Sequence, residues 1–101
     1  MGLERTREQR DKKAKVHLAQ YAPVWIADEE YLEEDESLLF NVVFQHNLYG
    51  WVNRRYRYDG FNDVLYHKGQ TAVAEEKALA LTETEPYIAP QVSDIPNAYG
   101  G

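Results

Sequence analysis

The chain of 101 residues contains no cysteine, so it can form neither a disulfide bond nor a thiolate metal site. Small secreted domains usually depend on disulfide bonds, and their absence favours a reducing compartment. No apolar run approaches the roughly 20 residues that a membrane-spanning helix needs, and the first residues are charged. We therefore expect a protein without signal peptide or membrane span, either cytoplasmic or peripheral on a membrane complex.

Catalytic and cofactor-binding motifs are also missing from the sequence. His17, His46 and His67 lie far apart, and no pair has the spacing of a metal-binding helix. The acidic residues between positions 28 and 36 form a solvated run, without the burial that would raise the pKa of one carboxyl group for acid catalysis. We expect no catalytic, cofactor or metal site, and a protein that is not an enzyme.

Charge is distributed unevenly along the chain, although its net value is −6. Residues 1–15 hold six Arg or Lys against three acids, whereas residues 28–36 hold seven acids and no base. The overall negative charge argues against general affinity for nucleic acid. A chain of this length forms at most one small domain. We divide it into a basic helical arm (1–22), a small body (23–84) and an extended tail (85–101).

The N-terminal segment from Leu3 to Tyr21 is rich in good helix formers and contains no proline, which predicts a helix. Its apolar residues gather near the C-terminal end, so the first three turns offer no apolar face to bury. Such a helix is either exposed to solvent or docked on a charged partner. After Pro23, a short apolar stretch and the acidic run predict one short helix or an irregular loop.

From Leu38 onward, apolar residues recur with the period of two that is typical of strands. Strands are predicted at about 38–46, 51–58 and 61–68. The sequence Asp59-Gly60 between aromatic strands predicts a two-residue hairpin turn, which would place Tyr58 opposite Phe61. The expected fold class is therefore α+β, with a three-stranded antiparallel meander.

After the meander, Gly69 is expected to end the last strand, and Thr71 is a plausible N-cap for a short helix from Ala72 to Leu81. Another strand over residues 71–84 is the alternative, because apolar residues alternate there. Residues 85–101 contain three prolines, which predicts an extended tail without regular structure.

A body with two arms is typical of a small accessory subunit that docks on a larger protein complex. Aromatic residues and arginine are enriched at interface hot spots, and apolar residues between prolines can lie along a groove at low entropic cost. The basic arm suits an acidic protein surface, RNA in a ribonucleoprotein or an anionic membrane face. The expected partner-binding residues are Trp51, Arg54, Arg55, Tyr56, Arg57, Tyr58, Tyr66, Tyr87, Ile88, Ile95 and Tyr99.

Two alternatives use the same residues. Arg54, Arg55 and Arg57 among tyrosines could form a platform for single-stranded RNA, on which bases stack and phosphates meet guanidinium groups. A tyrosine-rich sheet curled around Trp51 into a small barrel could instead hold a ligand or a catalytic pocket. Arginine alternating with aromatic residues also keeps a half-exposed hairpin soluble without any partner.

Overall fold

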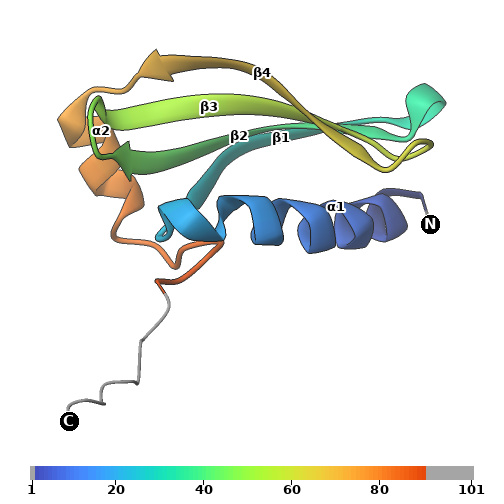
Figure 1. The fold of residues 1–101 in the computed structure, drawn as a ribbon, viewed down its shortest axis with the longest axis horizontal. Helices are drawn as coiled ribbons and strands as arrows, with labels where there is room; N and C mark the ends of the chain where they lie inside the picture. Colours follow the sequence, from blue (N-terminus) through green and yellow to red (C-terminus); the bar gives the residue numbers. More distant parts are fainter. Residues whose placement is uncertain (1, 91–101) are drawn as a thin grey trace, which may run out of the picture.

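The computed structural model describes residues 2–90 and shows a helix lying along one face of a four-stranded antiparallel sheet (Figure 1). This confirms the α+β class, the N-terminal helix and the short final helix. No helix in residues 2–90 has the length and apolar character needed to cross a membrane. The elements are α1 (Gly2–Leu18), η1 (Ala19–Tyr21), β1 (Trp25–Leu32), η2 (Glu33–Asp35), β2 (Ser37–His46), β3 (Gly50–Asp59), β4 (Val64–Ala72) and α2 (Glu75–Leu81).

The sheet has four strands in the order β1-β2-β3-β4, so the prediction of three strands was wrong. The missed strand is β1, which contains part of the acidic run predicted as a short helix or a loop. Its charges are sorted by face: Glu29 forms ion pairs with α1, whereas Asp28 and Glu30 are exposed on the other side. Charged residues are tolerated on an edge strand because one face and one edge meet solvent.

The loop between β3 and β4 is longer than the predicted two-residue turn. Asp59 pairs with Val64, which leaves the four residues 60–63 in the loop. The Asp59 carboxylate accepts hydrogen bonds from the backbone N–H groups of Phe61 and Asn62, at 2.9 and 3.1 Å. Asp63 adopts a positive φ of 57° and donates its N–H to the Asp59 carbonyl at 2.8 Å. An acidic side chain that holds the loop amides thus replaces the tight turn.

The longer loop changes the predicted cross-strand pairs and the extent of β4. Tyr58 lies opposite Leu65 rather than Phe61. The strand begins at Val64 and continues past Gly69, which was expected to end it. Gly69 has a φ of 151°, a conformation that glycine adopts readily, so the strand passes through this position without a break. Helix α2 consequently starts at Glu75, later than predicted.

Helix α1 packs along the sheet over most of its length, contrary to the expectation that its first three turns have nothing to bury. Its buried residues recur every four positions and so form one stripe: Thr6, Arg10, Ala14 and Leu18. Ala14 and Leu18 join the main hydrophobic core with Phe40, Phe44 and Tyr58. The stripe escaped prediction because two of its four members are polar.

Arg10 is the largest fully buried side chain, with 1% of its surface exposed. It donates to Glu29 at 2.8 Å and to Asp11 at 2.7 Å, and its guanidinium lies 4.6 Å from the centroid of the Phe40 ring. Arg7 also donates to Glu29, at 2.7 Å. Partial burial alone would raise the pKa of the Glu29 carboxyl group, but the two arginines outweigh it and lower that pKa. The contact between α1 and β1 is therefore ionic as well as apolar.

The start of the predicted tail packs on its own domain. Ile88 and Val24 form a short antiparallel bridge with backbone hydrogen bonds of 3.0 and 3.1 Å. The Tyr87 hydroxyl donates to Asp11 on α1, and its ring lies 5.6 Å from the Arg10 guanidinium carbon. Residues 85–90, which follow α2, thus pack on helix α1 and on the segment before β1.

Ending the chain at Thr84 should lower the free energy of unfolding by about 2 kcal/mol relative to a chain that ends at Pro90, because it exposes apolar area around Ile88 and removes two backbone hydrogen bonds. Urea unfolding of the two truncated chains, followed by tryptophan fluorescence, measures the difference. Equal stability would mean that residues 85–90 lie on the fold without supporting it.

Candidate functional site

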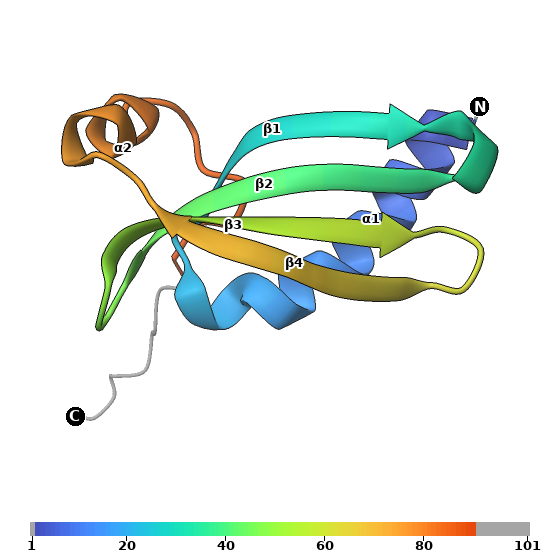
Figure 2. The ribbon, with the colours of Figure 1, turned by 90° about the horizontal axis from the view of Figure 1, so that it is seen from above.

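The two faces of the sheet differ in cover. Helix α1 crosses the face that we call the inner face, whereas α2 lies beside only one end of the other, the outer face (Figure 2). Trp25, Val43 and Ala78 are buried but lie outside the main core, so α2 covers a small apolar cluster of its own. The rest of the outer face is open. Over its covered and open parts together, the outer face consists of Asp28 and Glu30 of β1, Leu39, Asn41 and Val43 of β2, Trp51, Asn53, Arg55 and Arg57 of β3, and Tyr66, Lys68 and Thr71 of β4.

Three of the predicted partner-binding residues lie on the inner face. Tyr56 and Tyr58 are buried in the core. Arg54 donates to the Tyr56 hydroxyl at 3.1 Å and to Gln70 at 2.8 Å, and it stacks over Tyr21 and Phe44. Burial raises the pKa of the Tyr56 hydroxyl, which therefore stays protonated. The predicted set is thus divided between the two faces, and Arg54 lies on the opposite face from Arg55 and Arg57.

The four other sheet residues of the set, Trp51, Arg55, Arg57 and Tyr66, lie on the outer face. Arg57 pairs with Tyr66 across β3 and β4, and its guanidinium carbon lies 5.5 Å from the tyrosine ring centroid. The tail residues of the set are elsewhere: Tyr87 and Ile88 pack on the domain, and Ile95 and Tyr99 lie outside the described residues.

Charges on the outer face are ordered across the strands. One cross-strand row runs Asp28, Asn41, Arg55, and the next runs Glu30, Leu39, Arg57. Each row has an acid on β1, an uncharged residue on β2 and an arginine on β3. Because two strand spacings measure about 10 Å, acid and base in a row stand too far apart for an easy contact. The face thus has an acidic side at β1 and a basic side at β3 and β4.

None of these charged side chains forms an ion pair within the described part of the chain. Each of the four ion pairs in residues 2–90 includes a residue of α1. The outer-face cations Arg55, Arg57 and Lys68 take part in none of them. The outer-face acids Asp28 and Glu30 take part in none either. Their groups are available to a second molecule without the loss of an internal pair.

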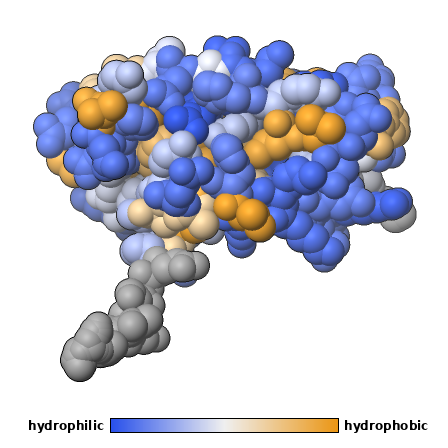
Figure 3. All heavy atoms as spheres, in the orientation of Figure 1, coloured by the Kyte–Doolittle hydropathy of each residue, from blue (hydrophilic) through white to orange (hydrophobic). Residues whose placement is uncertain are grey.

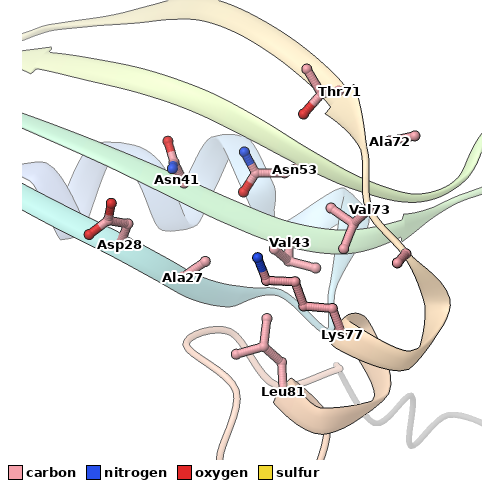
Figure 4. A pocket seen from close by; sticks show the side chains of 11 residues that line it. Ala27, Asp28, Asn41, Val43, Asn53, Thr71, Ala72, Val73, Lys77 and Leu81 are labelled. Atoms are coloured by element: carbon pink, nitrogen blue, oxygen red, sulfur yellow. The ribbon is translucent and has the colours of Figure 1, made fainter.

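The end of the outer face beside α2 is hollowed into a cleft of about 410 Å³ (Figure 4). Asn41, Asn53 and Thr71 reach into it from three strands, Asp28 lies at one side, and Lys77 extends over it from α2. A second hollow of about 210 Å³ shares Asp28 and Asn41 with the first and adds Glu30, Leu39, Arg55 and Lys68. We call the two together the trough.

Sequence reasoning missed the polar floor of the trough. Asn41 and Asn53 were read as strand residues, Thr71 as a helix N-cap and Lys77 as part of a helix, although Asn41 interrupts the apolar run from Leu38 to Phe44. Their positions follow from the observed alternation and register, with Asn53 opposite Val43 and Thr71. None of the side chains of Asn41, Asn53 and Thr71 hydrogen-bonds to another protein group in residues 2–90. The polar residue types were visible in the sequence. Their side chains form one site only because α2 packs at this face and because β4 has the register described above.

The edges of the sheet are less suited to binding than its outer face. The pairing of β1 with β2 shifts between Ile26 and Asp28, and that of β4 with β3 shifts next to Gly69. Each edge strand therefore carries a bulge, a device that discourages addition of a further strand. The sheet is also open, with β1 and β4 as its two edges, so it is not the barrel considered as an alternative.

Apolar side chains do not single out another surface. The side of the molecule in Figure 3 is largely hydrophilic, with separate hydrophobic patches. The exposed large apolar residues are spread over α1, two loops, β4 and α2: Val16, Leu48, Tyr49, Phe61, Val64, Tyr66 and Leu79. Recognition at the outer face would therefore depend mainly on polar and charged contacts.

The histidines occupy separate places in the described fold. His17 contacts the Tyr56 hydroxyl at 3.2 Å, and the His46 ring accepts the N–H of Leu48 at 3.0 Å. The pKa of His67 is lowered, first by burial and then by Arg54 and His17. Within residues 2–90, no group of three His, Asp or Glu residues is arranged to hold a metal ion.

Comparison with protein-family models, with characterised proteins and with solved structures finds no match for this chain. No relative therefore supplies a function, and the outer face is the feature that any proposal has to explain.

Proposed function

We propose that this protein is a non-catalytic accessory subunit that docks on a larger protein complex through the outer face of its sheet. The observation that supports the proposal is the contrast between the two faces. Helix α1 covers the inner face and takes part in all the ion pairs of residues 2–90, while the outer face holds unpaired charges of both signs in the open. Such ordered charge favours selective association with a surface of complementary pattern.

The residue types on this face also fit protein recognition. Arg57 and Tyr66 are stacked on each other, and Trp51 lies on the same strand as Arg57. Arginine, tyrosine and tryptophan are the types that most often contribute strongly to binding. The acids of β1 on the same face would repel the backbone of a nucleic acid, which makes a protein the better partner. The partner complex belongs in the cytoplasm or at the surface of a membrane.

Replacing Arg55 and Arg57 with Glu should reduce recovery of the partner at least about tenfold, because two attractive charges become repulsive. The full chain with an affinity tag is purified from its native host in low salt and mild detergent, and the proteins recovered are quantified by mass spectrometry. The matched control is Arg5→Glu with Lys12→Glu, an equal charge change at two exposed positions of α1, which should leave recovery unchanged.

Equal recovery by the wild type and both variants would show that the outer face does not bind the complex. Loss with the control pair alone would move the docking surface to α1. A ribonuclease step before purification should have no effect, whereas loss of the recovered proteins after it would favour the RNA alternative.

A further inference from the structure

The outer face is small for a folded partner. Three strand spacings of about 4.8 Å give it a width of about 14 Å, and the five residues from Leu39 to Val43 extend for about 13 Å. The area left open by α2 is thus of the order of a few hundred Å², below the roughly 800 Å² per partner that a stable interface between folded proteins buries. A narrower ligand matches these dimensions better.

The floor of the trough is suited to a peptide backbone. Asn41 and Asn53 present side-chain amides in the cleft, and Thr71 adds a hydroxyl. A side-chain amide offers one acceptor and two donors, so it can pair with the C=O and N–H of a passing peptide unit. Because these groups have no protein partner in residues 2–90, a ligand would replace only water.

The two sides of the trough are suited to side chains of opposite charge. Arg55 from β3 and Lys68 from β4 line the second hollow on the basic side, whereas Asp28 and Glu30 line it on the acidic side. Lys77 from α2 extends over the first cleft, next to Val43 and Ala27. Successive side chains of an extended peptide point to opposite sides. A segment that carries an acidic residue on one side and a basic residue on the other would meet both.

We propose that the trough binds an extended peptide segment of mixed charge, about four residues long at the contact. Its backbone lies on Asn41 and Asn53, and its acidic groups contact Lys77 over the cleft and Arg55 in the adjoining hollow. This inference rests on the proposed function, since it names the part of the larger complex that would enter the site. It also gives the lysine of α2 a role in binding.

Selection from a phage-displayed library of random 12-residue peptides tests the proposal. The immobilised full chain is the target. The library is first depleted on the double variant Asn41→Ala with Asn53→Ala, which removes peptides that bind elsewhere on the protein. Selected peptides should contain an acidic and a basic residue a few positions apart. Synthetic copies should lose about tenfold in affinity, by fluorescence anisotropy, for Lys77→Ala and for Asn53→Ala. Lys12→Ala, an exposed lysine of α1, is the matched control and should change nothing.

A charge exchange makes the test specific. Arg55→Glu should weaken a selected peptide about tenfold, and replacement of the peptide's acidic residue with Lys should restore the affinity. Circular dichroism of each variant checks that the fold is kept. Failure to obtain any peptide that binds the wild type but not the double variant would overturn the proposal. Selected peptides whose affinity is unchanged by Lys77→Ala and Asn53→Ala would also overturn it.

The outcomes separate this proposal from the proposed function. If Arg55→Glu with Arg57→Glu abolishes recovery of the complex but no peptide is selected, the outer face binds a folded surface and the peptide proposal is wrong. If that variant retains the complex and no peptide is selected, both proposals are wrong. If small zwitterions bind the trough as tightly as the selected peptides do, the site is not selective for peptides, and the peptide proposal is wrong.

Discussion

Replacing Glu29 with Ala is expected to lower the free energy of unfolding by about 3 kcal/mol, because it removes one of the two carboxylates paired with the buried guanidinium of Arg10 and the partner of Arg7. Arg10 is 1% exposed, and its Nη1 already lacks a hydrogen-bond partner in the described residues. The neighbouring substitution Glu30→Ala is the matched control, because Glu30 lies on the outer face and forms no ion pair in residues 2–90; it should change stability by less than about 0.5 kcal/mol. Urea unfolding followed by circular dichroism measures both.

The same contact predicts a dependence on pH. The pKa of Glu29 in the folded protein lies below its ordinary value of 4.5, so the carboxylate stabilises the fold above that pH. This stabilisation should be lost as the pH falls from the ordinary value through the lowered one, and the fall should be shallower in Glu29→Gln. Equal stability of Glu29→Ala and Glu30→Ala would contradict the buried role of Arg10.

Replacing Phe40 with Ala is expected to cost about 3–5 kcal/mol, the range for removal of a buried aromatic side chain. Phe40 is 2% exposed, and its ring lies 5.5 Å from that of Tyr56 and 4.6 Å from the Arg10 guanidinium carbon. Phe61→Ala is the matched control, because Phe61 is 65% exposed in the loop after β3. Thermal unfolding by differential scanning calorimetry measures both.

The control should stay within about 0.5 kcal/mol of the wild type. In Phe40→Leu, the leucine fills most of the space of the phenylalanine ring and should lower the free energy of unfolding by about 1 kcal/mol. This variant can be compared with Phe61→Ala if Phe40→Ala does not fold. Similar losses for Phe40→Ala and Phe61→Ala would mean that the face of β2 toward α1 is not the centre of the core.

Strands β2 and β3 could be predicted because their side chains alternate strictly between the apolar inner face and the outer face. Strand β1 could not, because its inner face includes Glu29, which is stabilised there by arginines that precede it by about 20 positions. A carboxylate in a strand is unfavourable by local preference alone. Its cation comes from another element, and local patterns do not contain that information.

The register of β4 was wrong for a related reason. The Asp59-Gly60 sequence favours a tight turn, but Gly60 is needed here for space: a Cβ on it would lie 2.3 Å from the backbone carbonyl of Glu36. Gly60 donates its N–H to that carbonyl at 2.9 Å. The loop is therefore shaped by its contact with the residue after η2, which the sequence around the turn does not reveal.

The candidate site was predictable only in part. Trp51, Arg55, Arg57 and Tyr66, which lie on the outer face, could be selected from their residue types. Successive side chains of a strand point to opposite faces, so Arg54 and Arg55 lie on different faces of the sheet. Grouping them in one binding set did not take this alternation into account. The trough could not be predicted without the β4 register and the position of α2, which brings Lys77 to the same cleft as Asn41, Asn53 and Thr71.

The polar stripe of α1 has a consequence for the order in which the chain folds during synthesis. This helix leaves the ribosome before the strands that cover it, and each strand pairs with the one made just before it. A helix with a broad apolar face would be prone to aggregate during that interval. Because α1 carries Thr6 and Arg10 where leucines could stand, it can remain solvated until the strands that cover it have been made.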